Sequence, residues 1–252
     1  MNMAVAPEAE DILARAFDYP YEAPDGAYLF RAGTALPLPD GYDLSGRAPV
    51  LAHGSNRAPA QLLRKFGRDG VGREAELPVT PVWLSGYDVV FAAQFAGYGA
   101  LPATLWPSPG TRVRVHVTWL TEAQRAIMDR TEGLFAATPR YRLLNLPSCV
   151  ACDLSGDLPD APAYLSLCGA LAPEGPEGGR ERGAPVAFSS VRAEGRRFPA
   201  MDGRTMIDRI ARELFRCEAE ALIRRIVGED GSGNREERDR ATAVLERLAL
   251  KL

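Results

Sequence analysis

The hydrophobic and polar positions divide the chain into a stretch of short strands followed by a helical stretch. Val113, Val115 and Val117 alternate with arginine, histidine and threonine, which is the period of a half-exposed strand. On this pattern His116 is an exposed strand residue. We expect strands in six apolar runs: 49–52, 79–93, 111–120, 140–146, 161–171 and 185–191. Many short strands separated by turn signals favour a curled or closed sheet.

Two helices are expected to interrupt these strands. Pro59 is a favoured first helical residue, and the helix that it opens should end at Gly67. Thr121 and Gln124 form a capping box for the second helix, with Gly133 as its C-cap.

Further helices flank the strand-rich stretch. A short helix is expected at residues 9–17, within an arm rich in turn-forming proline, glycine and aspartate. Beyond Gly195, Thr205 should cap a helix that runs on to Ile226, and Asn234 should cap another. The expected divisions are an N-terminal extension, a core and a C-terminal helical extension packed on the core, at 1–48, 49–195 and 196–252.

The composition of the 252 residues is that of a globular protein, with 46% hydrophobic residues, 25% charged residues and a formal net charge of −3. Of the 30 basic residues only Lys65 and Lys251 are lysines. The arginines are interleaved with acids, which indicates a solvated mixed-charge surface and no nucleic-acid partner. The N-terminus lacks a basic and apolar leader, and no run approaches the ~20 apolar residues of a membrane span. We therefore expect a cytoplasmic protein with no membrane partner.

The four cysteines, Cys149, Cys152, Cys168 and Cys217, are too few for a disulfide scaffold at this length. The first two form a Cys-x-x-Cys pair, but neither a second pair nor nearby histidines accompany it, as a zinc site would require. We expect ordinary thiols and no metal site.

The first candidate for chemistry is the turn "HGSN", between the strand at 49–52 and the helix at Pro59. Backbone N–H groups at such a turn can hold a carboxylate or an oxyanion. Gly54 allows a close approach of the backbone, and Ser55 and Asn56 add side-chain hydrogen bonds. The alternative is an Asx-type turn whose side chains only cap the helix.

The second candidate is Glu132, in "DRTEG" at the end of the second helix. The negative end of the helix dipole and partial burial would both raise the pKa of its carboxyl group. A raised pKa suits a general acid and base that works near neutral pH. The alternative is a solvated glutamate without a catalytic role.

These stretches together resemble the γ-glutamylcyclotransferase-like superfamily, also called AIG2-like or BtrG-like. Its pattern is an apolar strand ending in Tyr-Gly-Ser-Asn, then Ala-Thr-x-x-x-Ser-Pro-Gly, a strand, a helix and Asp-x-x-Glu-Gly. The chain has "AHGSN" at 52–56, "ATLWPSPG" at 103–110, "VRVHVTWLT" at 113–121 and "DRTEG" at 129–133, in the same order and spacing. The resemblance covers residues 50–171.

The resemblance implies an α+β fold, a small and mostly antiparallel barrel-like sheet with helices at its mouth. It implies that a γ-glutamyl amide is cyclised to 5-oxoproline with release of an amine or amino acid, without a metal or an organic cofactor. Glu132 would be the general acid and base of this reaction. The residues implied in binding the γ-glutamyl or similar carboxylate group are His53, Gly54, Ser55, Asn56 and Tyr164.

One departure from the family pattern is His53, which stands where the family has tyrosine. A histidine there makes the pocket wall smaller and titratable, which would change the choice of substrate. This departure and the long flanks motivate an alternative, a non-catalytic module that binds a small molecule or regulates. A homodimer or partner contact through the C-terminal helices is compatible with either function.

Overall fold

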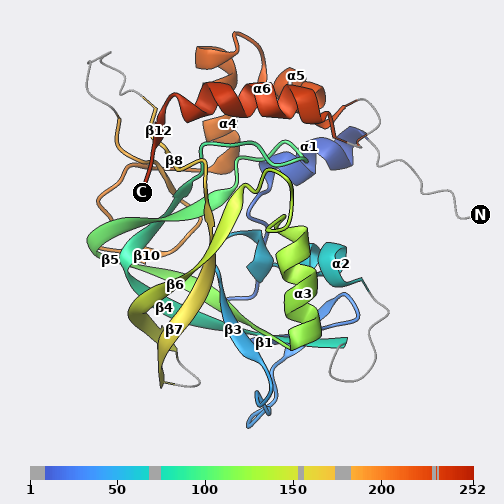
Figure 1. Cartoon of the computed structure of the whole chain (residues 1–252), viewed down its shortest axis with the longest axis vertical. Helices are drawn as coiled ribbons and strands as arrows, with labels where there is room; N and C mark the ends of the chain where they lie inside the picture. The colour runs from blue at the N-terminus through green and yellow to red at the C-terminus, as the bar shows by residue number, and fades with distance from the viewer. Residues whose placement is uncertain (1–8, 68–74, 153–155, 174–182, 229–230, 232) are drawn as a thin grey trace, which may run out of the picture.

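The computed structural model describes residues 9–67, 75–152, 156–173, 183–228, 231 and 233–252. It is an α+β structure with one large, mostly antiparallel sheet, and the last helices gather at one end of this sheet (Figure 1). The helices are α1 (Ala9–Phe17), the 3-10 helix η1 (Ser55–Arg57), α2 (Pro59–Phe66), α3 (Glu122–Thr131), α4 (Gly203–Leu214), α5 (Ala219–Val227) and α6 (Arg235–Glu246). The strands are β1 (Tyr28–Arg31), β2 (Thr34–Pro37), β3 (Ala48–Ala52), β4 (Glu76–Phe91), β5 (Ala103–Leu120), β6 (Tyr141–Cys152), β7 (Gly156–Ser166), β8 (Ala170–Leu171), β9 (Ala187–Phe188), β10 (Ala193–Glu194), β11 (Ala200–Met201) and β12 (Ala249–Leu250).

The large sheet has the strand order β10-β5-β3-β7-β6-β4-β1-β2, with β9 beside β4 and β11 beside β9. Strand β4 also pairs with β5, so the sheet curls back on itself. The parallel contact of β3 with β7 consists of the single pair Leu51 and Ala163. The predicted α+β class with a mostly antiparallel sheet is confirmed. Over the described residues, however, the curled sheet is not a closed barrel, because full-length ladders do not continue around it.

Strand β5 is longer than the expected run at 111–120, whereas β4 covers 76–91 where 79–93 was expected. Strand β5 begins at Ala103, because its first residues pair with the second half of β4. Gly86, with φ of 81°, lies at a register shift that lets β4 bend. The prediction that His116 is exposed is wrong: only 3% of it is exposed, because its side chain lies against the N-terminal arm, with Nε2 3.2 Å from the carbonyl oxygen of Pro24.

The bounds of the first three α-helices agree closely with the prediction, whereas the bounds of the C-terminal helices agree less well. Helices α1, α2 and α3 occupy the expected ranges, and the capping box of Thr121 is present. The helix expected to start at Thr205 starts earlier, because Asp202 is the N-cap and accepts a hydrogen bond from the Thr205 N–H. It also breaks into α4 and α5, with Arg216 between them at φ of 54°. Asn234 caps α6 as expected.

A single hydrophobic cluster joins the sheet to the flanking segments. It contains Ile12 of α1, Phe91 of β4 and Ile210, Ile223 and Leu245 of the last three helices. Strands β1 and β2 of the N-terminal arm, which the sequence pattern did not predict, extend the sheet beside β4. The division of the chain at residues 48 and 195 stays a prediction.

Two expectations concern features beyond the sheet. Among the described residues, no helix is long and apolar enough to cross a membrane. No group of three or more histidine, cysteine or acidic side chains is arranged to hold a metal ion in that part of the chain. The side chains of Cys149 and Cys152 lie outside the described part, whereas Cys168 and Cys217 are free thiols.

Candidate active site

The turn after β3 passes through Gly54 into η1, and the chain then enters α2. The Ala58 N–H donates to the Ser55 carbonyl over 2.9 Å, and Ala58 is the N-cap of α2, with Pro59 following it. Helix α2 has no side-chain cap. The alternative that the turn only caps this helix is therefore wrong, and the side chain of Asn56 is available for another partner.

Gly54 is needed because another side chain comes close to its Cα. A Cβ at this position would overlap the hydroxyl group of Tyr19 and would lie 3.4 Å from the Cβ of Ala103. The Tyr19 hydroxyl is held there because it accepts a hydrogen bond of 2.9 Å from the Ala103 N–H. Since φ of Gly54 is −114°, steric space and not backbone strain selects glycine. Tyr19 belongs to the N-terminal arm and was not predicted to line the site.

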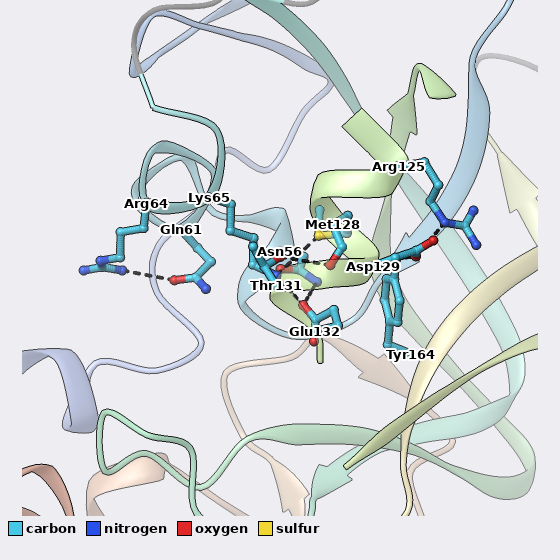
Figure 2. Close-up of polar contacts among 10 residues, drawn as sticks. All are labelled: Asn56, Gln61, Arg64, Lys65, Arg125, Met128, Asp129, Thr131, Glu132 and Tyr164. Atoms are coloured by element: carbon cyan, nitrogen blue, oxygen red, sulfur yellow. Dashed lines mark hydrogen bonds and ion pairs between the residues drawn. The ribbon is translucent and has the colours of Figure 1, made fainter. Parts of the chain in front are cut away.

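Glu132 lies at the end of α3, and Gly133 follows it with φ of 71°, which turns the chain away. Its Oε1 accepts a hydrogen bond of 2.9 Å from Asn56 Nδ2 and a second one from Lys65 Nζ. Figure 2 shows Lys65 extending from α2 toward α3, where it also lies 3.3 Å from the sulfur of Met128. The side chains of Lys65 and Glu132 are only 6% and 14% exposed. The structure thus brings Asn56 of the turn into direct contact with Glu132, and it adds Lys65, which was not predicted to belong to the site.

The electrostatics of Glu132 differ from the sequence-based expectation. Burial raises the pKa of its carboxyl group, but the charge and hydrogen bond of Lys65, the hydrogen bond of Asn56 and the nearby His53 lower it, and the net shift is downward. The expected raised pKa is therefore wrong, because it considered only burial and the helix dipole. Glu132 is a carboxylate at neutral pH.

Tyr164 lies on the other side of α3 (Figure 2). Its hydroxyl group donates to Oδ1 of Asp129, which also accepts a 2.9 Å hydrogen bond from Arg125 Nε. Tyr164 lines the same cavity as Glu132, but its hydroxyl group is engaged in fixing α3. Its expected contact with substrate stays a prediction.

His53 is buried beside Glu132. Burial lowers the pKa of its imidazole to about 4, although the charge of Glu132 and the backbone of Ala103 oppose this shift. His53 is therefore neutral at physiological pH, and the expectation that it gives the pocket a wall titrating near neutrality is wrong.

The turn and Glu132 line one cavity of about 540 Å³, a size typical of small-molecule sites. Three polar atoms on its wall are buried and have no hydrogen-bond partner among the described residues: His53 Nδ1, Asn56 Oδ1 and Gln94 Oε1. An unsatisfied buried acceptor costs roughly 1–3 kcal/mol. A ligand with several N–H donors, such as an ammonium group, would satisfy them.

The same cavity has further lining residues that were not predicted from the sequence. Tyr98 and Tyr141 are neutral, because burial raises the pKa of each well above its usual value. Arg140, Arg235 and Arg238 also line it, and the last two belong to α6.

Of three comparisons with known proteins, only the comparison with solved structures finds similar proteins. No protein-family profile matches the sequence, and a search of curated proteins finds no match. One similar structure is a gamma-glutamyl cyclotransferase, at 14% identity and a TM-score of 0.37, covering 78% of this chain and 99% of that one. Another is the uncharacterized human protein loc79017, at 17% identity and a TM-score of 0.38, covering 48% and 68%. A protein from Arabidopsis thaliana matches at 16% identity and a TM-score of 0.36, covering 50% and 73%.

The superfamily that the sequence motifs resemble is therefore represented among the similar solved structures. All these TM-scores are below 0.5 and all identities below 20%, so the similarities do not identify a reaction.

Proposed function

We propose that this protein is an enzyme of the γ-glutamylcyclotransferase type, which converts a γ-glutamyl amide into 5-oxoproline and a free amine. The observation that carries the proposal is the buried Glu132 carboxylate, which receives hydrogen bonds from Asn56 of the Gly-Ser-Asn turn and from Lys65 at the wall of the cavity. The substrate is a small molecule with a γ-glutamyl group. Its α-ammonium group fits the unsatisfied acceptors His53 Nδ1, Asn56 Oδ1 and Gln94 Oε1.

In this reaction the substrate's α-nitrogen attacks its own γ-carbonyl carbon, and the bond from that carbon to the leaving nitrogen breaks. The α-nitrogen loses two protons in total, and the leaving nitrogen gains two, so no co-reactant is consumed. Glu132 carries these protons one at a time. Both of these protein donors contact Oε1, so we assign proton transfer with the reacting nitrogen atoms to Oε2.

The lowered pKa of Glu132 has opposite effects on its two roles, which are to accept a proton from the ammonium group and to donate one to the leaving nitrogen. It makes Glu132 a weaker base toward the ammonium group, at a cost of about 1.4 kcal/mol for each pKa unit. It also makes the protonated Glu132 a stronger acid toward the leaving nitrogen. Lys65 thus favours departure of the amine, the step that needs an acid.

Most of the rate enhancement is assigned to orientation and charge stabilisation. Holding the flexible γ-glutamyl chain in a ring-closing pose can contribute up to roughly 7–11 kcal/mol. Backbone N–H groups in the turn at residues 54–56 are assigned to the substrate carboxylate or the developing oxyanion, at roughly 3 kcal/mol for a well-placed donor.

The test is a panel of γ-glutamyl amino acids and γ-glutamylamines, with 5-oxoproline and the released amine quantified by mass spectrometry. We expect Glu132→Gln to lower kcat by about 100- to 10,000-fold, the usual contribution of a general acid and base. Glu122→Gln makes the same chemical change at the exposed first turn of α3 and should leave kcat unchanged. Full activity of the Glu132→Gln variant would remove this residue from the mechanism.

The lowered pKa of Glu132 also favours a second candidate, a non-catalytic module that binds a small ammonium compound. An ion-paired carboxylate with low basicity binds cations without needing to accept a proton. This module would show saturable binding of γ-glutamyl compounds that depends on Asn56, without any 5-oxoproline. Product formation by the wild-type protein decides against it.

A further inference from the structure

Three arginines from distant parts of the chain line the same cavity as Glu132. Arg140 precedes β6, whereas Arg235 and Arg238 lie at the start of α6. Figure 1 shows α6 lying at the end of the sheet where the last helices gather. We call Arg140, Arg235, Arg238 and the acid that they share, Asp239, the arginine cluster.

The arginine cluster has one carboxylate for three guanidinium groups. Oδ1 of Asp239 accepts hydrogen bonds of 3.1 and 3.2 Å from Arg238 and a further one from Arg140. Arg235 Nε lies 3.7 Å from Oδ2 of the same side chain. These four residues therefore carry an excess of two positive charges.

Neighbouring acids on α6 do not neutralise this excess, because they have arginine partners of their own. Glu236 pairs with Arg240, and Glu237 pairs with both Arg240 and Arg225. The positive end of the α6 dipole lies at the same place and adds to the attraction for an anion.

One loop connects the arginine cluster to Glu132. It runs from Gly133 to Arg140, and the cavity wall between these ends includes the small side chains of Ala136 and Ala137. From the other side, Arg238 Nη1 lies 3.6 Å from the position that a Cβ on Gly97 would take. The wall therefore leaves space for a small group between Glu132 and the arginines, and the loop itself offers that group no charge.

We propose that the arginine cluster binds a carboxylate on the leaving group of the substrate. This inference rests on the proposed function and names the class of substrate within it: γ-glutamyl amino acids, in preference to γ-glutamylamines that carry no acid. Guanidinium groups suit this task because they bind a carboxylate through two parallel hydrogen bonds. Arg238 and Arg140, only 24% and 25% exposed, supply most of the attraction, since their charges are shielded from solvent.

The experiment compares γ-glutamyl-L-alanine with γ-glutamyl-L-alaninamide, which has the same shape without the negative charge. We expect the acid to have a kcat/KM about 10- to 100-fold higher, the effect of a charge-assisted hydrogen bond. Arg238→Gln and, separately, Arg140→Gln should remove most of this preference by lowering kcat/KM for the acid, with less than about threefold effect on the amide.

Arg240→Gln is the matched control, because Arg240 lies on the same helix, is 65% exposed and pairs only with glutamates in the described part of the chain. It should keep the preference of the wild type. Circular dichroism confirms that each variant is folded, and the second arginine variant keeps the test open if the first does not fold.

The outcomes separate the two proposals. Equal turnover of acid and amide by the wild type overturns the role of the arginine cluster and leaves the proposed function standing. Absence of turnover with both compounds overturns the proposed function, and calorimetric titration of the same two compounds then tests the cluster alone. Tighter binding of the acid that Arg238→Gln abolishes supports the cluster, and equal binding or none overturns it.

Discussion

The cavity contains two charged regions that differ in burial and in net charge. Around Glu132, one carboxylate meets one lysine, and both side chains are nearly buried. In the arginine cluster, three guanidinium groups share Asp239, which is 45% exposed, so these four residues carry two excess positive charges. Burial makes an unpaired charge costly, so the first region has to be neutral overall, whereas the second can keep its excess for a ligand.

This difference separates proton transfer from recognition. The buried pair of Glu132 and Lys65 can take up or release a proton while the two side chains stay together. Its state therefore depends mainly on pH. A charged and partly exposed cluster attracts an anion and responds mainly to salt. If the two regions are distinct in this way, substitutions near Glu132 should change the response to pH, and the arginine cluster should change the response to salt.

The largest effect is expected from Lys65→Met, which keeps the volume of the side chain and removes its charge. Breaking a buried ion pair on one side costs about 3–5 kcal/mol of unfolding free energy near neutral pH. Without Lys65, burial is the largest influence on Glu132 and is opposed by the Asn56 hydrogen bond and by His53, so the pKa of this carboxyl group should rise above its unfolded value. The acid limb of the pH profile of kcat/KM should move to higher pH.

The pH dependence of stability should also change sign in Lys65→Met. In the wild type the pKa of Glu132 is lowered, so its contribution is present above its unfolded pKa and is lost as the pH falls through the folded pKa. In Lys65→Met the pKa of Glu132 is raised, so the contribution of this carboxyl group to the pH dependence of stability has the opposite sign. The folded protein should then become less stable as the pH rises.

Lys251→Met is the matched control, since Lys251 is the other lysine and is 51% exposed beside Glu246. Urea unfolding should show a change of less than about 1 kcal/mol for this variant. An equally small change for Lys65→Met would mean that the buried pair does not hold Glu132.

A smaller effect is expected from the two histidines. Burial lowers the pKa of both His53 and His116 to about 4, so the unfolded chain takes up a proton first as the pH falls. Stability should decrease between about pH 6.5 and pH 4, by about 3 kcal/mol for each histidine in full.

His53→Gln should remove about half of this decrease and should alter substrate affinity, whereas His116→Gln should remove a similar part and leave affinity unchanged. Urea unfolding at several pH values from 7 to 4 measures the first effect, and KM measures the second. A pH dependence that survives in both variants would show that carboxyl groups cause it.

The smallest effect is expected from salt. Because Arg235 is 75% exposed and Asp239 45%, mobile ions should screen the arginine cluster. Between about 0.05 and 0.5 M NaCl, kcat/KM for γ-glutamyl-L-alanine should fall about threefold, and kcat/KM for its amide should stay constant. A parallel fall for both substrates would place the salt effect elsewhere.

Helix-start and helix-end residues in the sequence predicted those parts of the site that depend on contacts between residues close together in the chain. Pro59, the Thr121 capping box and the "TEG" end of α3 gave the two helices and the position of Glu132. The sign of its pKa shift could not be predicted in this way, because Lys65 belongs to another helix and is far away in the sequence. The rarity of lysine in an arginine-rich chain was the signal that could have directed attention to it.

The same limit explains the other omissions. A mixed-charge helix such as α6 reads as a solvated surface, and only the tertiary structure shows that Arg238 meets Arg140 at Asp239. The break between α4 and α5 depends on one residue, Arg216, with a positive φ that its side chain does not signal. His116 is buried because the N-terminal arm, which is far away in the sequence, lies against it at Pro24.

The most direct test of the central claim is the product balance of the wild-type protein with γ-glutamyl-L-alanine. If Glu132 mediates ring closure, 5-oxoproline and alanine should appear in equal amounts, and Glu132→Gln should abolish both while the protein stays folded. Release of glutamate in place of 5-oxoproline, or the same product yield from the Glu132→Gln variant, would contradict the claim.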